Sequence, residues 1–454
     1  MSTTAATQTL TVGEIIEQRS LGRYQIWTVV LCGLVLVLDG FDSQTINFIA
    51  PSVADSIHAP VKTFGPIFSA GLFGLMIAAM TTGPIADRWG RKWPVILSTL
   101  SFAFFSLLTV HVTSFRELLI LRFLTGLGLG GAMPNVVALA SEFVPRRLLP
   151  QVVTLLFVGM PFGGVTCGLL SAKMIPRWGW QSVLYLGGTI PLIIAILLMA
   201  GLPESIQFLA ARGKNPQRVA RILSRIAPEF TAANLRATPR DTQHEGVPVV
   251  HLFTEGRAFG TILLWIPYFM NLLIIYFIGS WLPALLRQTG MSVSSGATAT
   301  AFFSFGGVFG CLFEGWLIKR RGAYLVLLTE FAVATFFVAA LSKIPSSFAL
   351  MLSITFVSGL MVIGAQAGLN ALAANFYPTA VRSTGIGWAL GVGRIGSIVG
   401  PLLGGMFLTW GWKPEQILLS ATAAAACAWL AIFFSKRMGG RTSAYTPAPP
   451  VLSH

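Results

Sequence analysis

Two acidic residues interrupt a stretch of sequence that is otherwise apolar. Asp39 and Asp42 lie within the run from Leu34 to Phe48. An ionised side chain at the centre of a membrane helix costs about 2.5 to 3.5 kcal/mol, so acids at such positions usually serve a function. Their spacing of three residues places both carboxyls on one face of a helix. Gly40 between them lets another backbone come close.

A buried carboxyl beside a like charge is a candidate for reversible protonation. A low dielectric and a neighbouring carboxylate both favour the neutral form of the acid. We therefore predict that Asp39 and Asp42 load a proton on one side of a membrane and release it on the other. The two acids can titrate as a unit, so the sequence does not assign the proton to one of them. The alternative is a structural pair that is hydrogen-bonded to neighbouring helices.

Two arginines, Arg122 and Arg394, also lie inside apolar stretches. Arg394 is predicted at about the same depth as Asp39, and its planar guanidinium suits a carboxylate ligand. We predict that it anchors an anionic substrate, with a permanent ion pair to a neighbouring acid as the alternative. Arg122 is expected near the outer end of its span and Glu142 near the inner end of the same span. Gating, proton relay and structural salt bridges remain open for these two residues.

The elements that position these residues follow from composition. Of the 454 residues 54% are hydrophobic and only 10% are charged, which predicts a polytopic membrane protein. The apolar runs are continuous rather than alternating, so we expect an all-α protein and not a β-barrel. The first 24 residues are polar, so no cleavable signal is expected. Four separate cysteines give no metal or redox spacing.

Twelve spans are predicted, and the basic residues orient them. The spans are 25–49, 66–86, 94–112, 117–144, 151–172, 183–202, 259–286, 296–318, 324–342, 348–374, 383–408 and 415–435. Loops on the side of the N-terminus hold 22 of the 31 Lys and Arg residues, and the opposite loops hold seven. By the positive-inside rule, both termini are cytoplasmic. The net charge of +15 is then an orientation bias, and a nucleic-acid partner is not expected.

The chain repeats itself at a shift of about 232 residues. This shift places residues 178–180, Trp-Gly-Trp, on residues 410–412 of the same sequence, and Gly90 on Gly322. The repeat predicts a transporter with its site between two halves. The expected parts are a cytoplasmic segment 1–24, a six-helix half 25–202, a cytoplasmic linker 203–258, a second half 259–435 and a cytoplasmic tail 436–454.

The linker contains an amphipathic helical pattern. Its apolar positions fall on one face and its arginines on the other; the apolar positions are Val219, Ile222, Leu223 and Ile226. We predict a helix on the acidic inner surface of the membrane, with binding to a partner protein as the alternative.

The loop between the second and third spans carries the most specific motif. Residues 83–92, Gly-Pro-Ile-Ala-Asp-Arg-Trp-Gly-Arg-Lys, resemble the signature of the major facilitator superfamily at that place, and residues 315–322 resemble a weaker second copy. Asp-Gly-Phe-Asp at 39–42, the fourth span and residues 376–382 are similar to the aromatic acid:proton symporter family, which includes 4-hydroxybenzoate and protocatechuate transporters. Lys319 departs from the pattern, because many members of the superfamily repeat an acid there.

The signature loop is predicted to work as a conformational latch. Asp87 can accept hydrogen bonds from a facing helix or pair with Arg382, and the basic residues can bind carboxylates or lipid phosphates. The latch residues are Gly83, Asp87, Arg88, Gly90, Arg91, Lys92 and Arg382. The alternative is that the basic residues only orient the protein in the membrane.

The resemblance implies a substrate with an aromatic ring. Polar groups in the spans that suit a ring hydroxyl are Asn135, Gln366 and Asn370, and rings that suit stacking are Trp388 and Phe302. Most aromatic residues in such spans face lipid or core, so these five assignments rest on residue type alone.

Other functional classes fit less well. The glycine motif of drug exporters resembles residues 396–405, but it lies in the eleventh span instead of the fifth. An intramembrane enzyme would need a nucleophile and base or metal ligands within the spans, and no such motif occurs. A membrane sensor would usually add a soluble output domain.

The expected protein is thus a proton-coupled importer of a small aromatic carboxylate. It works by alternating access, without a cofactor, as a monomer in a bacterial inner membrane. Its partners are the substrate, protons and membrane lipids. The alternatives are transport of another organic anion, export, and a non-transporting sensor.

Overall fold

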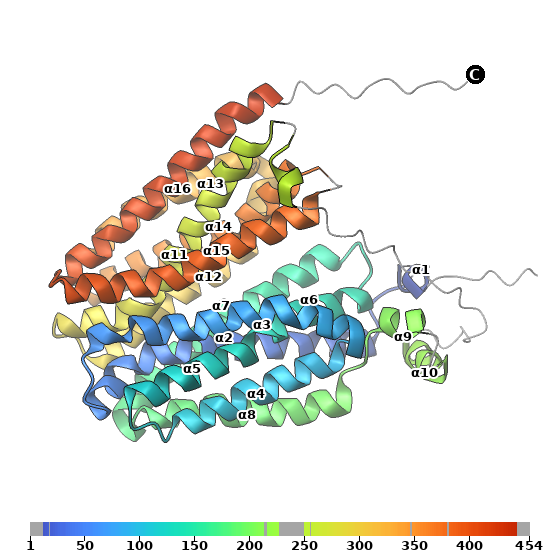
Figure 1. The fold of residues 1–454 in the computed structure, drawn as a ribbon, viewed down its shortest axis with the longest axis horizontal. Helices are drawn as coiled ribbons and strands as arrows, with labels where there is room; N and C mark the ends of the chain where they lie inside the picture. Colours follow the sequence, from blue (N-terminus) through green and yellow to red (C-terminus); the bar gives the residue numbers. More distant parts are fainter. Residues whose placement is uncertain are drawn as a thin grey trace, which may run out of the picture.

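The computed structural model describes residues 12–17, 19–212, 216–226, 249–254, 256–345, 347–378 and 381–442. The predicted N-terminal segment up to residue 11, residues 213–215, 227–248 and 255 of the linker, and the tail beyond 442 lie outside these residues. Twelve helical spans are long and apolar enough to cross a membrane among the described residues, which confirms the all-α, twelve-span class (Figure 1).

The first six spans form the N-terminal half and the last six form the C-terminal half. The N-terminal half consists of α2 (Arg23–Ser56), α3 (Gly65–Trp89), α4 (Lys92–Thr109), α5 (Phe115–Gly130) with α6 (Ala132–Phe143), α7 (Leu149–Trp178) and α8 (Gln181–Gly201). The C-terminal half consists of α11 (Ala258–Gln288), α12 (Val293–Arg321), α13 (Ala323–Leu341), α14 (Phe348–Phe376), α15 (Arg382–Thr409) and α16 (Pro414–Thr442). The shorter elements are α1 (Val12–Glu17), η1 (Val61–Phe64), α9 (Ile206–Arg212), α10 (Pro216–Ile226) and η3 (Val249–Leu252).

The helix ends show the repeat in backbone geometry. Gly90 and Gly322, 232 residues apart, end α3 and α12 with φ of 90° and 79°. Gly179 and Gly411 have φ of 76° and 78° at the ends of α7 and of the turn after α15. A positive φ is unfavourable for residues with a Cβ, so glycine at the same place in both halves preserves the same turn.

Glycines bring the long helices into close contact. A Cβ on Gly40 of α2 would overlap the backbone carbonyl of Met160 in α7, and one on Gly396 of α15 would overlap the carbonyl of Phe269 in α11. In membranes, where helices gain little from burying apolar surface, such close backbone packing is a main source of association. The pairs α2–α7 and α11–α15 therefore form matching seams in the two halves.

The fourth span is broken in the middle. α5 ends at Gly130 and α6 begins at Ala132, just before Pro134, which cannot donate a backbone hydrogen bond and clashes with the preceding turn. The side-chain amide of Asn135 donates to the carbonyl of Gly131 at 2.8 Å, which satisfies an acceptor at the break.

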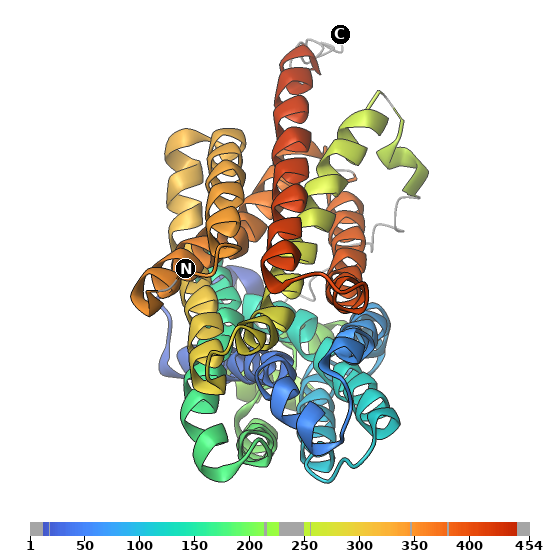
Figure 2. The same ribbon diagram turned by 90° about the vertical axis from the view of Figure 1, so that its left-hand side faces the viewer.

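The two halves meet at one end of the bundle and diverge toward the other (Figure 1). At the meeting end, here called the closed end, Phe68 and Trp281 form an edge-to-face contact at 5.3 Å between ring centroids, and Ser69 donates to the carbonyl of Ile398 at 2.7 Å. One apolar core joins residues of both halves there. Two further cores, one in each half, lie toward the other end. Figure 2 looks onto the closed end and shows the two groups of helices one above the other.

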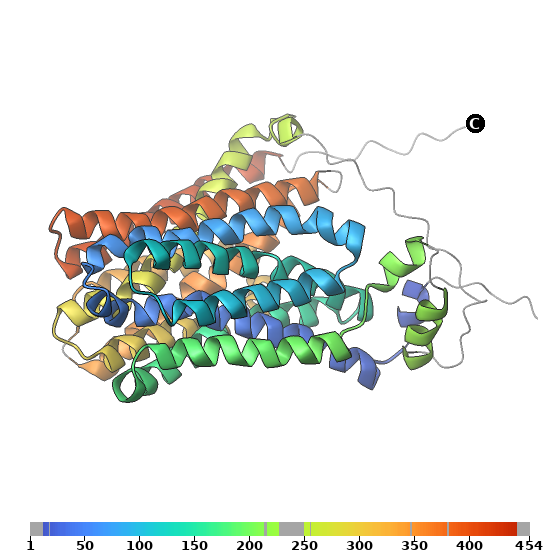
Figure 3. The ribbon, with the colours of Figure 1, turned by 60° about the horizontal axis from the view of Figure 1, so that its bottom comes forward.

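The end where the halves diverge, here called the linker end, carries α1, α9 and α10 (Figure 3). The apolar face of α10 is buried, because Val219 and Leu223 belong to the same core as Ile15 and Ile16 of α1. The predicted contact of this face with lipid is therefore not made in this structure; the face lies against the N-terminal half. The apolar pattern correctly predicted the helix and its apolar face, but it could not predict which surface covers that face.

Helix ends extend beyond several predicted spans. α2 continues to Ser56 instead of residue 49, and α7 continues to Trp178 instead of residue 172. The predicted ends followed the apolar run, whereas the backbone stays helical through polar residues beyond it. Ser114, Ser292 and Ser347 begin α5, α12 and α14 as N-caps, each accepting a backbone N–H in the first turn.

Candidate functional site

Asp39 on α2 and Arg394 on α15 belong to opposite halves and lie within electrostatic range of each other. Asp39 is 1% exposed, and the hydroxyl of Ser43, one turn further along α2, donates to its Oδ1 at 3.2 Å. The guanidinium of Arg394 lies close enough to act on the Asp39 carboxyl by its charge. Arg394 is half-buried and forms no direct ion pair among the described residues. Its N–H donors are therefore open to a carboxylate ligand.

Asp42 faces a different arginine, which belongs to its own half. Arg122 Nη1 lies 4.0 Å from Asp42 Oδ2, and the two side chains are almost fully buried. Neither oxygen of Asp42 has a hydrogen-bond partner within the described part of the chain, and the same holds for Nε and Nη2 of Arg122. A buried ion pair at this separation is poorly compensated for its loss of water. Protonation of Asp42, or a small shift that shortens its distance to Arg122, would therefore lower the energy of this pair.

Glu142 lies away from the two aspartates, at the linker end of α6. It forms an ion pair with Arg91, and the hydroxyl of Ser205 donates to its two oxygens at 2.8 and 2.7 Å. Next to it, Glu204 accepts the backbone N–H of Arg91 at 2.7 Å and of Lys92 at 3.1 Å. Glu142 at the end of α6 and Glu204 after α8 thus both bind the start of α4, within the N-terminal half.

The remaining latch residues lie at the linker end, Arg382 at the start of α15 and the others around the turn between α3 and α4. Asp87 is exposed and has no ion-pair partner among the residues that the structure describes. Arg382, on the C-terminal half, donates from Nε to the carbonyl of Tyr377 at 3.3 Å. A Cβ on Gly83 would meet nothing, whereas Gly90 lies against the carboxyl of Glu204. The predicted contact between Asp87 and Arg382 is not formed in this structure.

Two polar pairs connect α11 and α14 inside the C-terminal half. Tyr268 donates its hydroxyl hydrogen to Asn370 Oδ1 at 2.8 Å, and Asn271 donates from Nδ2 to Gln366 Oε1 at 3.1 Å. Sequence reasoning found Gln366 and Asn370 but missed Tyr268 and Asn271. Asn271 was visible as the single amide in an apolar span, and Tyr268 carried no distinguishing signal.

The aromatic candidates lie in contacts of their own. Trp388 stacks on Trp265, with 6.2 Å between the ring centroids. Trp388 precedes Arg394 by six residues on α15, which is about 9 Å along the helix axis. Phe302 packs edge-on against Phe305 at 6.0 Å. These contacts do not by themselves place either ring beside Arg394. Asn135 is engaged at the helix break of the fourth span.

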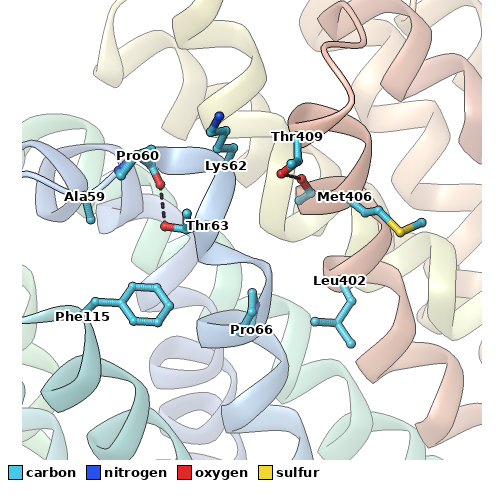
Figure 4. A pocket seen from close by; sticks show the side chains of 10 residues that line it. Ala59, Pro60, Lys62, Thr63, Pro66, Phe115, Leu402, Met406 and Thr409 are labelled. Carbon is cyan, nitrogen blue, oxygen red and sulfur yellow. Dashed lines mark hydrogen bonds between the residues drawn. The ribbon is translucent and has the colours of Figure 1, made fainter.

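A pocket of about 570 Å³ lies at the closed end, between the start of α3 and the end of α15 (Figure 4). Its lining includes Lys62, Phe115, Leu402 and Met406. It contains none of the residues predicted for substrate or proton. The candidate site is therefore the polar set around Asp39 and Arg394, deeper in the bundle.

Comparisons with known proteins fit this arrangement. The family model described as Major Facilitator Superfamily matches residues 32–380 and 264–452. The chain is 40% identical to a 4-hydroxybenzoate transporter, PcaK, of Pseudomonas putida, over 93% of this chain and 94% of that protein. It is 40% identical to a gallate transporter of Pseudomonas putida, over 88% and 89%, and 33% identical to a benzoate transport protein of Acinetobacter baylyi, over 88% and 87%.

A solved structure shares the fold at low sequence identity. It is the crystal structure of a bacterial homologue of the human lysosomal transporter Spinster, in an inward-facing and occupied conformation. The TM-score is 0.71 at 14% identity, with 94% of this chain and 100% of that chain covered.

Proposed function

The chain belongs to the Major Facilitator Superfamily, and from this premise we propose that it is a proton symporter that imports a small aromatic carboxylate of the hydroxybenzoate or protocatechuate kind. Relatives that cover most of the chain are named as transporters of 4-hydroxybenzoate, gallate and benzoate, which supports aromatic acids as the substrate class. The observation that carries the proposal is that the charge of Arg394, in the C-terminal half, acts on the buried carboxyl of Asp39 in the N-terminal half.

Charge balance couples the proton to the substrate in this site. In the empty site the Arg394 guanidinium and the Asp39 carboxylate offset each other. A substrate carboxylate that binds Arg394 adds a second negative charge in a low dielectric, so its binding is easier when Asp39 takes up a proton. Loss of that proton restores the carboxylate of Asp39, which competes for Arg394 and favours release of the substrate.

The membrane potential makes this coupling useful. An inside-negative potential opposes entry of an anion by about 2.3 kcal/mol per charge per 100 mV. One proton carried with the anion cancels this penalty, because the net charge moved is then zero. With two protons the net charge moved is +1, so the potential favours entry. Asp42 beside Arg122 is the second place where a proton can be held.

The basic loops support a cytoplasmic linker end in a bacterial inner membrane. The structure then represents the inward-facing state of a monomer, with the closed end toward the periplasm. In this state Asp87 and Arg382 lie on halves that have separated at the linker end. We assign them to a latch that forms when this end closes, with Glu142 and Arg91 holding the N-terminal side of the latch in shape.

Uptake of labelled 4-hydroxybenzoate into proteoliposomes tests the proposal. We expect accumulation when the outer solution is more acidic than the lumen, and none above equilibration without a gradient. Asp39→Asn keeps the size of the side chain but cannot carry a proton, so it should bind substrate and fail to accumulate it. Asp39→Glu is the matched control that retains an acid and part of the gradient-driven uptake.

Two results would count against the mechanism. Accumulation by Asp39→Asn at the rate of the unsubstituted protein would remove Asp39 from proton coupling. Failure of the unsubstituted protein to bind or transport any aromatic acid would refute the function itself.

A further inference from the structure

The Asn271–Gln366 pair leaves hydrogen-bonding groups unused inside the membrane. Asn271 is fully buried and Gln366 is half-buried, and one hydrogen bond joins their amides. The buried Oδ1 of Asn271 and Nε2 of Gln366 have no partner among the described residues. Buried polar groups are nearly always hydrogen-bonded, so an unpartnered donor and acceptor side by side indicate that a hydrogen-bonding partner is missing here.

This conclusion does not depend on how the amides are oriented. If both amides were turned around, Gln366 would donate to Asn271, and the pair would again keep one donor and one acceptor free. The neighbouring pair one turn away differs, because Tyr268 and Asn370 leave no buried polar atom without a partner.

The amide pair lies near the depth of the Arg394 anchor. Asn271 is 13 residues from the start of α11, Gln366 ten from the end of α14 and Arg394 twelve from the start of α15, and all three of these helix ends are at the linker end. At 1.5 Å per residue these positions lie at about 20, 15 and 18 Å along their helices.

α15 also packs directly on the turn that holds Asn271. A Cβ on Gly393, the neighbour of Arg394, would touch Leu272 and the carbonyl of Tyr268. Mid-span polar groups face the interior of a bundle rather than lipid. The guanidinium and the amide pair therefore lie at similar depth, on helices that pack against each other.

We propose that the Asn271–Gln366 amide pair binds the ring hydroxyl of the substrate and sets a preference for hydroxylated benzoates over benzoate. This rests on the function proposed above. A phenolic hydroxyl both donates and accepts one hydrogen bond, which matches the one free acceptor and the one free donor. A ligand without the hydroxyl leaves both groups unpaired in a dry site, and this kind of mismatch discriminates more strongly than a change of size.

Binding to the purified full-length protein in lipid nanodiscs tests this subsite. The ligands are 4-hydroxybenzoate, benzoate and 4-methoxybenzoate, which accepts a hydrogen bond but cannot donate one. We expect the unsubstituted protein to prefer 4-hydroxybenzoate over both. Asn271→Leu and Gln366→Leu should each weaken binding of 4-hydroxybenzoate about tenfold, as expected for one lost hydrogen bond in a buried site. Their affinity for benzoate should change far less, so the preference disappears.

Retained benzoate binding also shows that each variant is folded. Ser358→Ala is the matched control on α14, because Ser358 is buried and its hydroxyl already donates to the carbonyl of Ile354. It should alter neither affinity nor preference.

The possible failures are distinguishable. If the unsubstituted protein binds benzoate and 4-hydroxybenzoate equally, or if both leucine variants lose the two ligands to the same extent, the subsite is refuted while aromatic acid transport stands. If no aromatic acid binds at all, the proposed function fails as well.

Discussion

Arg394 and Arg122 both lie inside the bundle, but their surroundings leave the two guanidinium groups differently accessible to a ligand. Arg122 is enclosed next to Asp42 in its own half, and both side chains are almost fully buried. Arg394 is half-buried and meets the charge of Asp39 across the interface of the halves. An anion that enters between the halves therefore finds the guanidinium of Arg394 more open, which is why we assign the anchor to it.

Arg394→Lys tests this assignment. Lysine keeps the charge but loses the planar pair of N–H donors, so binding of benzoate should weaken at least about tenfold. Binding of benzamide, which has no carboxylate, should change much less. Isothermal titration with both ligands measures the two effects, and equal losses for both would mark Arg394 as a structural residue.

Glu314 and Glu330 show how a residue-scale feature can escape sequence reasoning. They lie on α12 and α13, are 2% and 5% exposed, and their carboxyl groups are within hydrogen-bonding reach of each other. Two carboxyl groups can share a hydrogen bond only if one of them holds the hydrogen. In the sequence these acids are separate residues in separate spans, and only the packing of the helices brings them together.

Glu330→Gln should preserve this contact, since an amide can donate to the carboxylate of Glu314. We expect its thermal unfolding in detergent to match that of the unsubstituted protein. Glu330→Ala leaves Glu314 buried without that partner and should cost about 1 to 3 kcal/mol of stability. A larger loss for the glutamine variant than for the alanine variant would contradict this reading.

At the scale of elements, the seam between α2 and α7 holds Asp39 in place. Gly40, the next residue, lies directly against the backbone of Met160. Gly40→Ala should force the two helices apart, lower stability by about 1 to 3 kcal/mol and reduce uptake because Asp39 moves with α2. Thermal unfolding and proteoliposome uptake measure the two effects.

Gly33→Ala provides the control on the same helix. A Cβ there would meet only Leu156, at 3.9 Å, so the change should leave uptake intact. It should not lower stability either, because alanine favours the helix more than glycine does. Equal losses in the two variants would mean that close packing at Gly40 has no special role.

At the scale of the whole molecule, an exposed ion pair bridges the halves at the closed end. Arg287 Nη2 lies 2.7 Å from Asp55 Oδ2, and the side chains are 37% and 62% exposed. Exposed pairs of this kind contribute about 0 to 1 kcal/mol. The ion pair is therefore present in the closed state but adds little to the free energy needed to open this end.

A cross-link at this place should stop the transport cycle. Replacing Asp55 and Arg287 by cysteine and joining them with a reducible reagent should block uptake, and a reductant should restore it. Cysteines at Thr113 and Glu117, which contact each other within the N-terminal half, control for the reagent. Uptake by the cross-linked protein would show that the closed end need not open.

The sequence predicted the fold well because the apolar runs are long and the turn glycines repeat in both halves. It also singled out Asp39 and Arg394 as candidates, because charged residues are costly in lipid and therefore rare in spans; their roles in transport stay predictions. It did not find Asn271 or Tyr268, since a single amide or phenol is common inside spans. Nor did it give the pairing of Asp42 with Arg122 or of Arg91 with Glu142, because partners depend on which helices touch.

The apolar core that both halves share at the closed end implies a dependence on temperature. An outward-open state must bring water to surfaces around Phe68 and Trp281, whereas the core of each half near the linker end is already complete within that half. Hydrating apolar surface raises the heat capacity, so the enthalpy that separates the two states changes with temperature and a van 't Hoff plot of their ratio should curve. Cooling weakens apolar association. A cell grown in the cold should thus hold more of its empty carriers open to the outside than the same cell grown warm.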